Sequence, residues 1–275
     1  MSPPPLEPRL VRRYLVALGV RPHKPSLRAL RELVFAHLTR IPFENISKIH
    51  YRKHYGLAGL TPLDLYLEGV ERYHFGGTCY SNNFHLYALL SSLGFDTRLC
   101  GADMNNPDVH LVTIVTVGGH EYLIDAGYGA PFLVPLPRDL STDYVIEWGR
   151  DRYVLRPQDG VGRSRLDMYR EDRRVHGYIV KPKPRVIEEF SRVIRDSFLP
   201  TATFLNALLL VRFRRDFSVM IHNMTLVRSE GRESRVRVLR DRRELVATIE
   251  QQFRMPRPMV TESVDQLSQL TDAWA

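Results

Sequence analysis

The sequence has very little cysteine: only Cys79 and Cys100 occur among its 275 residues. Two cysteines at this spacing form neither a metal-ligand motif nor a disulfide framework. No apolar run is long enough to cross a bilayer, and the start, Met1-Ser2-Pro3-Pro4-Pro5, is unlike a secretory signal peptide. Internal repeats are missing, and so are low-complexity segments beyond these prolines. These absences predict a cytoplasmic protein with no metal site and no membrane partner.

Charge of one sign is in modest excess. The formal net charge is +8 and the sequence pI is about 9.6, within an ordinary globular composition of 44% hydrophobic and 25% charged residues. The basic residues are scattered, most densely between Arg232 and Arg243, and no nucleic-acid-binding motif accompanies them. The excess therefore favours an anionic cofactor, such as a nucleotide thioester, over nucleic acid as the partner.

Hydrophobic periodicity predicts a helical first third. A helix over residues 9–19 ends at a glycine, and Ser26 caps a second helix that Pro42 prevents from continuing. Thr61-Pro62-Leu63-Asp64 has the pattern of an N-cap followed by a first helical turn. A fourth helix begins near Cys79 and stops at Gly94. Residues 1–94 are therefore expected to form a helical bundle.

The period changes to two after Gly94. Seven short β-branched or aromatic runs follow, as expected for an antiparallel sheet or barrel over residues 95–184. These runs are 97–101, 110–117, 121–126, 144–148, 152–155, 166–169 and 175–180.

Pro182-Lys183-Pro184 separates a last region, 185–275, in which helices and strands mix. The expected order is a helix over 186–195, strands over 205–213, 217–222, 224–228 and 234–239, and a helix capped by Asp241. The polar tail after Pro256 is expected to be loose.

Cys79 stands directly after a tight Gly76-Gly77 turn and at the start of a helix. The helix dipole favours a thiolate at this place. A lone cysteine here is more often a small buried side chain, so Cys79 needs support from elsewhere in the chain. Cys100 lies inside a predicted strand and is interpreted as structural.

That support comes from a predicted hairpin. Gly118-Gly119 is a two-residue turn signal between two strand-like runs. If the two glycines form the loop, His110 and Asp125 become diagonal neighbours on one face, about 7–8 Å apart at Cα. A carboxylate that orients an imidazole beside a thiol is the arrangement for thiolate nucleophilic catalysis. A surface histidine and an ordinary turn aspartate are the plainer interpretations, but not for all three residues together.

Four segments, in their order and spacing, resemble the arylamine N-acetyltransferase family. They are Arg40-Ile41-Pro42-Phe43-Glu44-Asn45, Gly76-Gly77-Thr78-Cys79 with Asn83, His110-Leu111-Val112, and Tyr122-Leu123-Ile124-Asp125-Ala126-Gly127-Tyr128-Gly129. Pro200 and Phe204 also fall where the family has a similar pair. The likeness weakens but persists through about residue 255.

The resemblance implies an α+β fold with an N-terminal helical bundle, a central antiparallel β-barrel and a C-terminal α/β lid. It implies ping-pong acetyl transfer from acetyl-CoA, as co-substrate, to an arylamine, hydrazine or related amine. The site residues carried over by resemblance are the triad Cys79, His110 and Asp125, the substrate-binding Phe43, Tyr128 and Phe204, the cofactor-binding Gly127 and Gly129, and the supporting Glu44, Asn45 and Asn83.

Two departures from the family pattern concern the support of the site. Phe75 stands where the family has an arginine, which leaves Glu44 without its usual partner; Arg40 or Arg72 is expected to replace it, because an unpaired buried carboxylate is costly. Ser81 replaces a common Glu or Gln.

Three other functions stay open at this point: an amide synthase of natural-product assembly, a Cys-His-Asp hydrolase or transglutaminase-like protein, and a non-catalytic binding protein on the same fold. The oligomeric state is not predicted.

Overall fold

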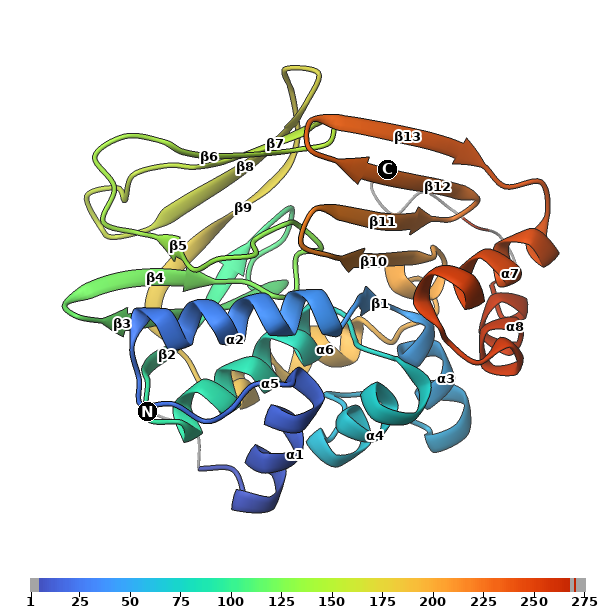
Figure 1. Ribbon diagram of the computed structural model, residues 1–275, viewed down its shortest axis with the longest axis horizontal. Coiled ribbons are helices and arrows are strands. Elements are labelled where there is room, and N and C mark those ends of the chain that lie inside the picture. Colours follow the sequence, from blue (N-terminus) through green and yellow to red (C-terminus); the bar gives the residue numbers. More distant parts are fainter. Residues whose placement is uncertain (1–4, 268–269, 271–275) are drawn as a thin grey trace.

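The computed structural model describes residues 5–267 and residue 270. Helices form one layer and two antiparallel sheets lie against it (Figure 1). The helical layer comes from the first third of the chain, with the elements α1 (Pro8–Leu18), α2 (Leu27–Arg40), α3 (Ile46–Tyr55), α4 (Leu63–Tyr73) and α5 (Cys79–Ser92). The α+β class is thus confirmed.

The middle third forms an eight-stranded antiparallel sheet of order β5-β4-β3-β2-β9-β8-β7-β6, which corresponds to the expected barrel. Its strands are β2 (Asp96–Asp103), β3 (His110–Val117), β4 (His120–Ile124), β5 (Leu136–Pro137), β6 (Tyr144–Trp148), β7 (Asp151–Leu155), β8 (Ser164–Arg170) and β9 (Arg173–Pro184). Gly118 and Gly119 have φ of 60° and 81°, so the β3–β4 loop uses the left-handed conformation that glycine permits.

The second sheet has five strands in the order β1-β10-β11-β12-β13. Four come from the last third of the chain, β10 (Leu209–Phe213), β11 (Phe217–His222), β12 (Thr225–Glu230) and β13 (Glu233–Val238), and the fifth is β1 (Phe43–Glu44). The sequence did not predict β1, which is only two residues long and pairs with β10 across a large sequence separation.

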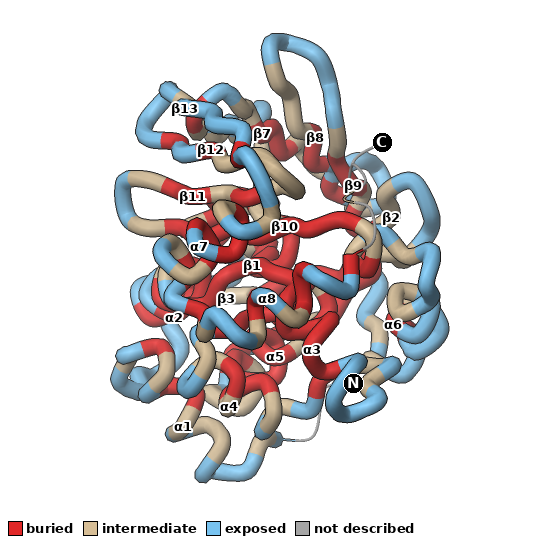
Figure 2. The backbone as a smooth tube through the Cα atoms, turned by 90° about the vertical axis from the view of Figure 1, so that its right-hand side faces the viewer, coloured by how far each residue is buried: buried red, intermediate tan, exposed pale blue. Residues whose placement is uncertain are grey.

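Helix α5 occupies the centre of the molecule. Ten of its fourteen residues are buried, because the helix packs against β2 and β3 on one side and against α1 on another. In Figure 2 the buried backbone, in red, gathers around α5, β1 and β10, whereas the outer hairpins are exposed. The nucleophile candidate therefore begins the most enclosed helix.

Several expected elements differ in the structure. The predicted helix over 186–195 is a short 3₁₀ turn (Ile187–Phe190) continued by α6 (Ser191–Asp196), and β10 begins only at Leu209, after a 3₁₀ turn at Thr203–Leu205. The N-cap of α4 is Pro62 rather than Thr61, one residue later than predicted.

The C-terminal expectations were half right. Asp241 caps α7 (Arg242–Phe253) by accepting a hydrogen bond from the Glu244 N–H at 2.8 Å. The segment after Pro256 is not loose, because it forms α8 (Arg257–Asp265), which packs on α3 and α7 through Val260 and Val264. The rest of the tail, apart from residue 270, lies outside the described residues. None of the described helices combines the length and apolarity needed to span a membrane.

Candidate active site

The turn before Cys79 is held from three sides. An added Cβ at Gly76 would lie 1.9 Å from the carbonyl oxygen of Pro42, so only glycine fits there. The Glu44 N–H donates to the Gly77 carbonyl at 3.1 Å, and the Asn82 side-chain amide donates to the same carbonyl at 3.0 Å. The chain then enters α5 with Cys79 as its first residue, half-buried.

His110 and Asp125 meet as the hairpin register requires. Val117 faces His120 and Thr113 faces Ile124, which is the register predicted from the two glycines. His110 Nε2 lies 2.8 Å from Asp125 Oδ2, and both side chains are fully buried. The predicted contact between imidazole and carboxylate is present.

Asp125 is held by two further donors. Its Oδ1 accepts hydrogen bonds from the Asn83 side-chain amide at 2.8 Å and from the Gly127 N–H at 2.9 Å. Asn83 Oδ1 in turn accepts from the Ala126 N–H at 2.6 Å. Because Asn83 belongs to the same helix as Cys79, one rigid element positions both the thiol and the carboxylate.

The electrostatics favour a charged pair. Burial alone would raise the pKa of Asp125, but His110 and the Asn83 hydrogen bond lower it below its usual range. Burial alone would lower the pKa of His110, but Asp125 and the Cys79 sulfur raise it to about 10. His110 is therefore protonated and Asp125 ionised near neutral pH.

The second nitrogen of His110 is directed to the thiol by elimination. Asp125 occupies Nε2, and Nδ1 has no hydrogen-bond partner among the described residues. The Cys79 sulfur nevertheless lies near enough to raise the pKa of His110. The arrangement is a thiol beside an oriented imidazolium, with the final hydrogen bond not yet closed, as often occurs without substrate.

The predicted substrate-binding aromatics lie together beside the triad. The rings of Phe43 and Phe204 are 5.6 Å apart, and the ring of Tyr128 is 6.1 Å from that of His110. Tyr128 also pairs through its hydroxyl with His176 Nδ1 at 2.7 Å. These contacts bring together residues from β1, from the loop after β4 and from the segment before β10.

The two glycines of the predicted cofactor loop have different structural roles. A Cβ at Gly127 would come within 2.6 Å of the Cys79 Cα, so this position must stay glycine for the loop to pack on α5. Gly129 has a φ of +76°, a left-handed backbone that also favours glycine. Both observations concern packing and leave cofactor binding untested.

The prediction that Arg40 or Arg72 neutralises Glu44 is wrong. Arg72 pairs with Glu68 on the surface, and Arg40 is exposed beside Gly19. The buried Glu44 carboxylate instead accepts hydrogen bonds from the N–H groups of Ser47 at 2.9 Å and Gly76 at 3.0 Å. Burial raises the pKa of Glu44, although these hydrogen bonds oppose the shift.

Phe75 fills the space that the family's arginine would occupy with a cluster of rings. Its ring centroid lies 5.9 Å from His50, 6.0 Å from Tyr51 and 5.4 Å from Tyr73, and only 1% of the residue is exposed. The nucleophile turn is thus supported by aromatic packing on one side and by backbone hydrogen bonds to Glu44 on the other.

Asn45 connects distant parts of the site. Its side chain donates to the carbonyls of Phe204 and Ala207 at 2.9 and 2.8 Å and accepts from the Leu209 N–H at 2.9 Å. The other departure from the family pattern, Ser81, makes only a long hydrogen bond of 3.4 Å to Thr61.

Sequence reasoning missed three polar residues of the site. Asn82 is buried and accepts from the Tyr66 hydroxyl at 2.8 Å, and Tyr178 places its ring 5.1 Å from His110. Lys48 is the third. The adjacent asparagines in α5 were a visible signal for Asn82, whereas Tyr178 in β9 and Lys48 in α3 reach the site only through tertiary contacts.

Lys48 is a buried cation near the nucleophile. Its ammonium group donates to the Ser197 hydroxyl at 2.8 Å and lies 4.2 Å from the centre of the Phe198 ring. Among the described residues no carboxylate lies within ion-pair distance of it. Burial lowers the pKa of Lys48 to about 8, although the nearby Cys79 sulfur raises it. Lys48 lines a small pocket with Thr78 and Tyr80, the neighbours of Cys79.

A family model described as N-acetyltransferase matches residues 26–258 of the chain. The chain belongs to the arylamine N-acetyltransferase family. The match spans most of the sequence and includes all three triad positions. The family is one of enzymes, and the expectation drawn from the four sequence segments is confirmed.

Curated relatives agree with this assignment. The chain is 27% identical over 206 residues to arylamine N-acetyltransferase 2 of Mus musculus, covering 65% of this chain and 67% of that protein. It is 25% identical over 218 residues to arylamine N-acetyltransferase 1 of Homo sapiens, covering 69% and 71%. The alignments span about two thirds of the length of these relatives.

Solved structures of the family share the fold along nearly the whole chain. The arylamine N-acetyltransferase of Nocardia farcinica superposes with a TM-score of 0.75 at 25% identity, covering 94% of this chain and 95% of that one. The enzyme of Mycobacterium marinum, solved in complex with CoA, superposes with a TM-score of 0.77 at 22% identity, covering 94% and 99%.

Proposed function

We propose that the protein transfers an acetyl group from acetyl-CoA to a small aromatic amine or hydrazine through a thioester on Cys79. The observation that carries this proposal is the buried His110–Asp125 pair, 2.8 Å between Nε2 and Oδ2, beside the first residue of α5. Family membership and the CoA complex of the Mycobacterium marinum relative support acetyl-CoA as the donor.

The first half-reaction begins with the Cys79 thiolate and the His110 imidazolium. The sulfur attacks the acetyl carbonyl carbon, and the bond between that carbon and the coenzyme A sulfur breaks. His110 gives its proton to the departing coenzyme A thiolate. The products are acetylated Cys79, neutral His110 and free coenzyme A.

The second half-reaction reverses these roles with the amine. The amine nitrogen attacks the thioester carbonyl, and neutral His110 takes the proton that the nitrogen loses. The Cys79 thiolate leaves, and the thiolate–imidazolium pair is restored. Asp125 stays ionised throughout and keeps Nε2 occupied, so that Nδ1 remains the nitrogen that exchanges the proton.

The acceptor is proposed to bind against Phe43, Tyr128 and Phe204. Three aromatic rings beside the nucleophile favour a flat acceptor, since rings gain from edge and stacked contacts. Tyr128 belongs to the loop of Gly127 and Gly129, which is proposed to contact the coenzyme A thioester, while Glu44, Asn45 and Asn83 hold the turn and the carboxylate.

Intact-protein mass spectrometry tests the proposal. Acetyl-CoA alone should add one acetyl group to the wild type and none to Cys79→Ser, and Cys100→Ser should behave as the wild type. An arylamine should then remove the adduct much faster than water does. Steady acetate release without an amine would indicate a hydrolase instead. An unmodified protein would rule out acetyl-CoA as the donor.

A further inference from the structure

Two histidines and a glutamate meet on the side of the molecule away from the triad. His50 and His54 stand one turn apart on α3, and Glu262 faces them from α8. His54 Nε2 lies 2.6 Å and His50 Nδ1 lies 3.7 Å from the same glutamate oxygen, Oε2. One donor atom from each of the three residues falls within 4.8 Å of the others.

One of these donor atoms is buried without a hydrogen bond. His50 is 92% buried, and its Nδ1 has no hydrogen-bond partner among the described residues, because Glu262 Oε2 is too far for one. A buried polar nitrogen without a partner costs free energy, so native structures rarely keep one unless another group completes it. This nitrogen is directed at Glu262 and His54.

The spacing suits a small divalent transition metal. Zinc binds histidine nitrogen at about 2.0–2.1 Å and carboxylate oxygen at about 2.0–2.2 Å, so tetrahedral donors stand about 3.3 Å apart. The His50–Glu262 distance of 3.7 Å needs a small contraction, and the His54–Glu262 hydrogen bond needs a small opening. Two histidines at i and i+4 with one carboxylate form a known zinc donor set.

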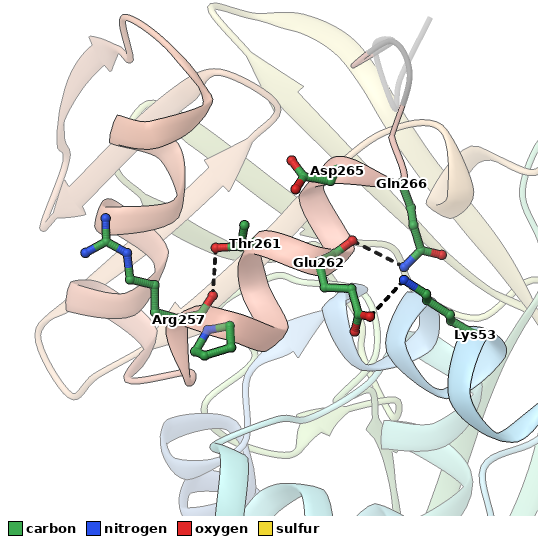
Figure 3. A pocket seen from close by; sticks show the side chains of 7 residues that line it. Lys53, Arg257, Thr261, Glu262, Asp265 and Gln266 are labelled. Carbon is green, nitrogen blue, oxygen red and sulfur yellow. Dashed lines mark hydrogen bonds and ion pairs between the residues drawn. The ribbon is translucent and has the colours of Figure 1, made fainter.

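We infer that His50, His54 and Glu262 form a zinc-type metal site that joins α3 to α8. Three protein ligands leave a fourth position for water. The site opens on a pocket lined by Lys53, Glu262 and Gln266 (Figure 3), which supplies a path for the ion. The expectation from the sequence, no metal site, concerned cysteine patterns and did not consider these residues.

Lys53 fits this arrangement as a partner of the carboxylate. Its ammonium group lies 2.8 Å from Glu262 Oε1, the oxygen that the histidines do not approach (Figure 3). Lys53 thereby fixes the carboxylate so that Oε2 points at the histidines. Outer groups of this kind orient the ligands of a metal, although the positive charge of Lys53 weakens the attraction for the ion.

The site lies behind the nucleophile turn. The His50 ring packs 5.9 Å from the ring of Phe75, the residue just before Gly76. A metal at this place would hold α8 against α3 and keep the aromatic cluster under the turn in place. Its expected effect is therefore on stability, and the triad chemistry does not require it.

Titration of tag-free protein with Zn²⁺ and Co²⁺ tests the inference. Because the Cys79 thiolate also binds these ions, the titrations use the Cys79→Ser background. We expect one equivalent per chain, the visible bands of tetrahedral Co²⁺ without a sulfur charge-transfer band, and a melting temperature that rises with Zn²⁺ concentration. His54→Gln and Glu262→Gln should each weaken binding at least about 10-fold.

His120→Gln is the matched control. His120 pairs with Asp139 at 3.2 Å on the surface, a similar histidine–carboxylate contact without a third donor. Its removal should leave the affinity unchanged. His54 is 42% exposed, so His54→Gln should still fold. Sub-stoichiometric binding, or equal affinity in wild type, His54→Gln and Glu262→Gln, would overturn the metal site.

Discussion

His110 and His37 are two fully buried histidines in opposite electrostatic states. His110, on the first sheet, meets the Asp125 carboxylate, and its pKa is raised to about 10. His37, inside the helical layer on α2, meets only the Tyr14 hydroxyl at 3.2 Å, and burial lowers its pKa to about 3. One carries a proton at neutral pH and the other does not.

The difference teaches that burial does not make an imidazole reactive. Burial alone acts in the same direction on both histidines, favouring the neutral form. Only the carboxylate, itself fixed by Asn83 and the Gly127 N–H, reverses the sign for His110. The catalytic property therefore belongs to the group of donors around Asp125 rather than to the histidine.

Asp125→Asn breaks this contrast and should have the largest effect. The substitution keeps the shape of the side chain but removes the charge that keeps His110 protonated, so His110 becomes electrostatically similar to His37. We expect the rate of Cys79 acetylation to fall by roughly 10³- to 10⁴-fold. Stopped-flow or quenched-flow measurement of the acetyl adduct gives the rate, and a circular dichroism spectrum checks the fold. A loss of less than 10-fold would contradict the assigned role.

The pH dependence of stability sharpens the contrast, because the two histidines act with opposite sign. The folded protein holds the His110 proton more tightly than the unfolded chain, whose histidine pKa is about 6.5. Its contribution is complete below pH 6.5 and is lost as pH rises toward 10. The pKa of His37 is depressed, so its contribution is present above pH 6.5 and is lost as pH falls toward 3.

Urea unfolding across pH 4–10 measures both effects. His110→Gln should flatten the fall in unfolding free energy on the alkaline side and leave the acid side unchanged. His37→Gln should flatten the acid side only. An unchanged alkaline slope in His110→Gln would mean that its proton is not held by the fold.

Lys48 extends the comparison to a buried cation without a carboxylate, and its removal should have the smallest effect. In Lys48→Met we expect the unfolding free energy at pH 7 to rise by about 1 kcal/mol, because a poorly compensated buried charge disappears. Alkylation of Cys79 by iodoacetamide should slow by about 2- to 5-fold, because the cation attracts the thiolate. Lys24→Met, at an exposed lysine, should change neither quantity. Faster alkylation in Lys48→Met would contradict the electrostatic role.

The geometry of His110 and Asp125 was predictable because local chemistry determines it. Two glycines specify the loop, and the two-residue period of a strand then places both side chains on one face. The same locality made Ser26 and Asp241 reliable helix caps, and the structure shows both hydrogen bonds, to the N–H groups of Ala29 and Glu244.

Features set by tertiary contacts were not predictable. Helix α3 carries the charged run Arg52-Lys53-His54 and is stable because its other face packs on α8 and the nucleophile turn. The partners of Glu44 were misassigned, since a search for an opposite charge overlooked backbone N–H groups. Lys48 approaches Cys79 only because α3 folds back toward α6.

The two-residue strand β1 has a consequence for how the protein is made. The ribosome delivers all three triad residues in the first half of the chain, yet β1, which also bridges Gly77, finds its partner only in β10. Asn45 and Leu209, which close this junction, are 164 residues apart. Contacts of such separation form late, because a long loop must close first. A nascent chain therefore carries its cysteine unsupported until synthesis has passed β10, so the reactive thiol matures after translation of the second sheet has begun.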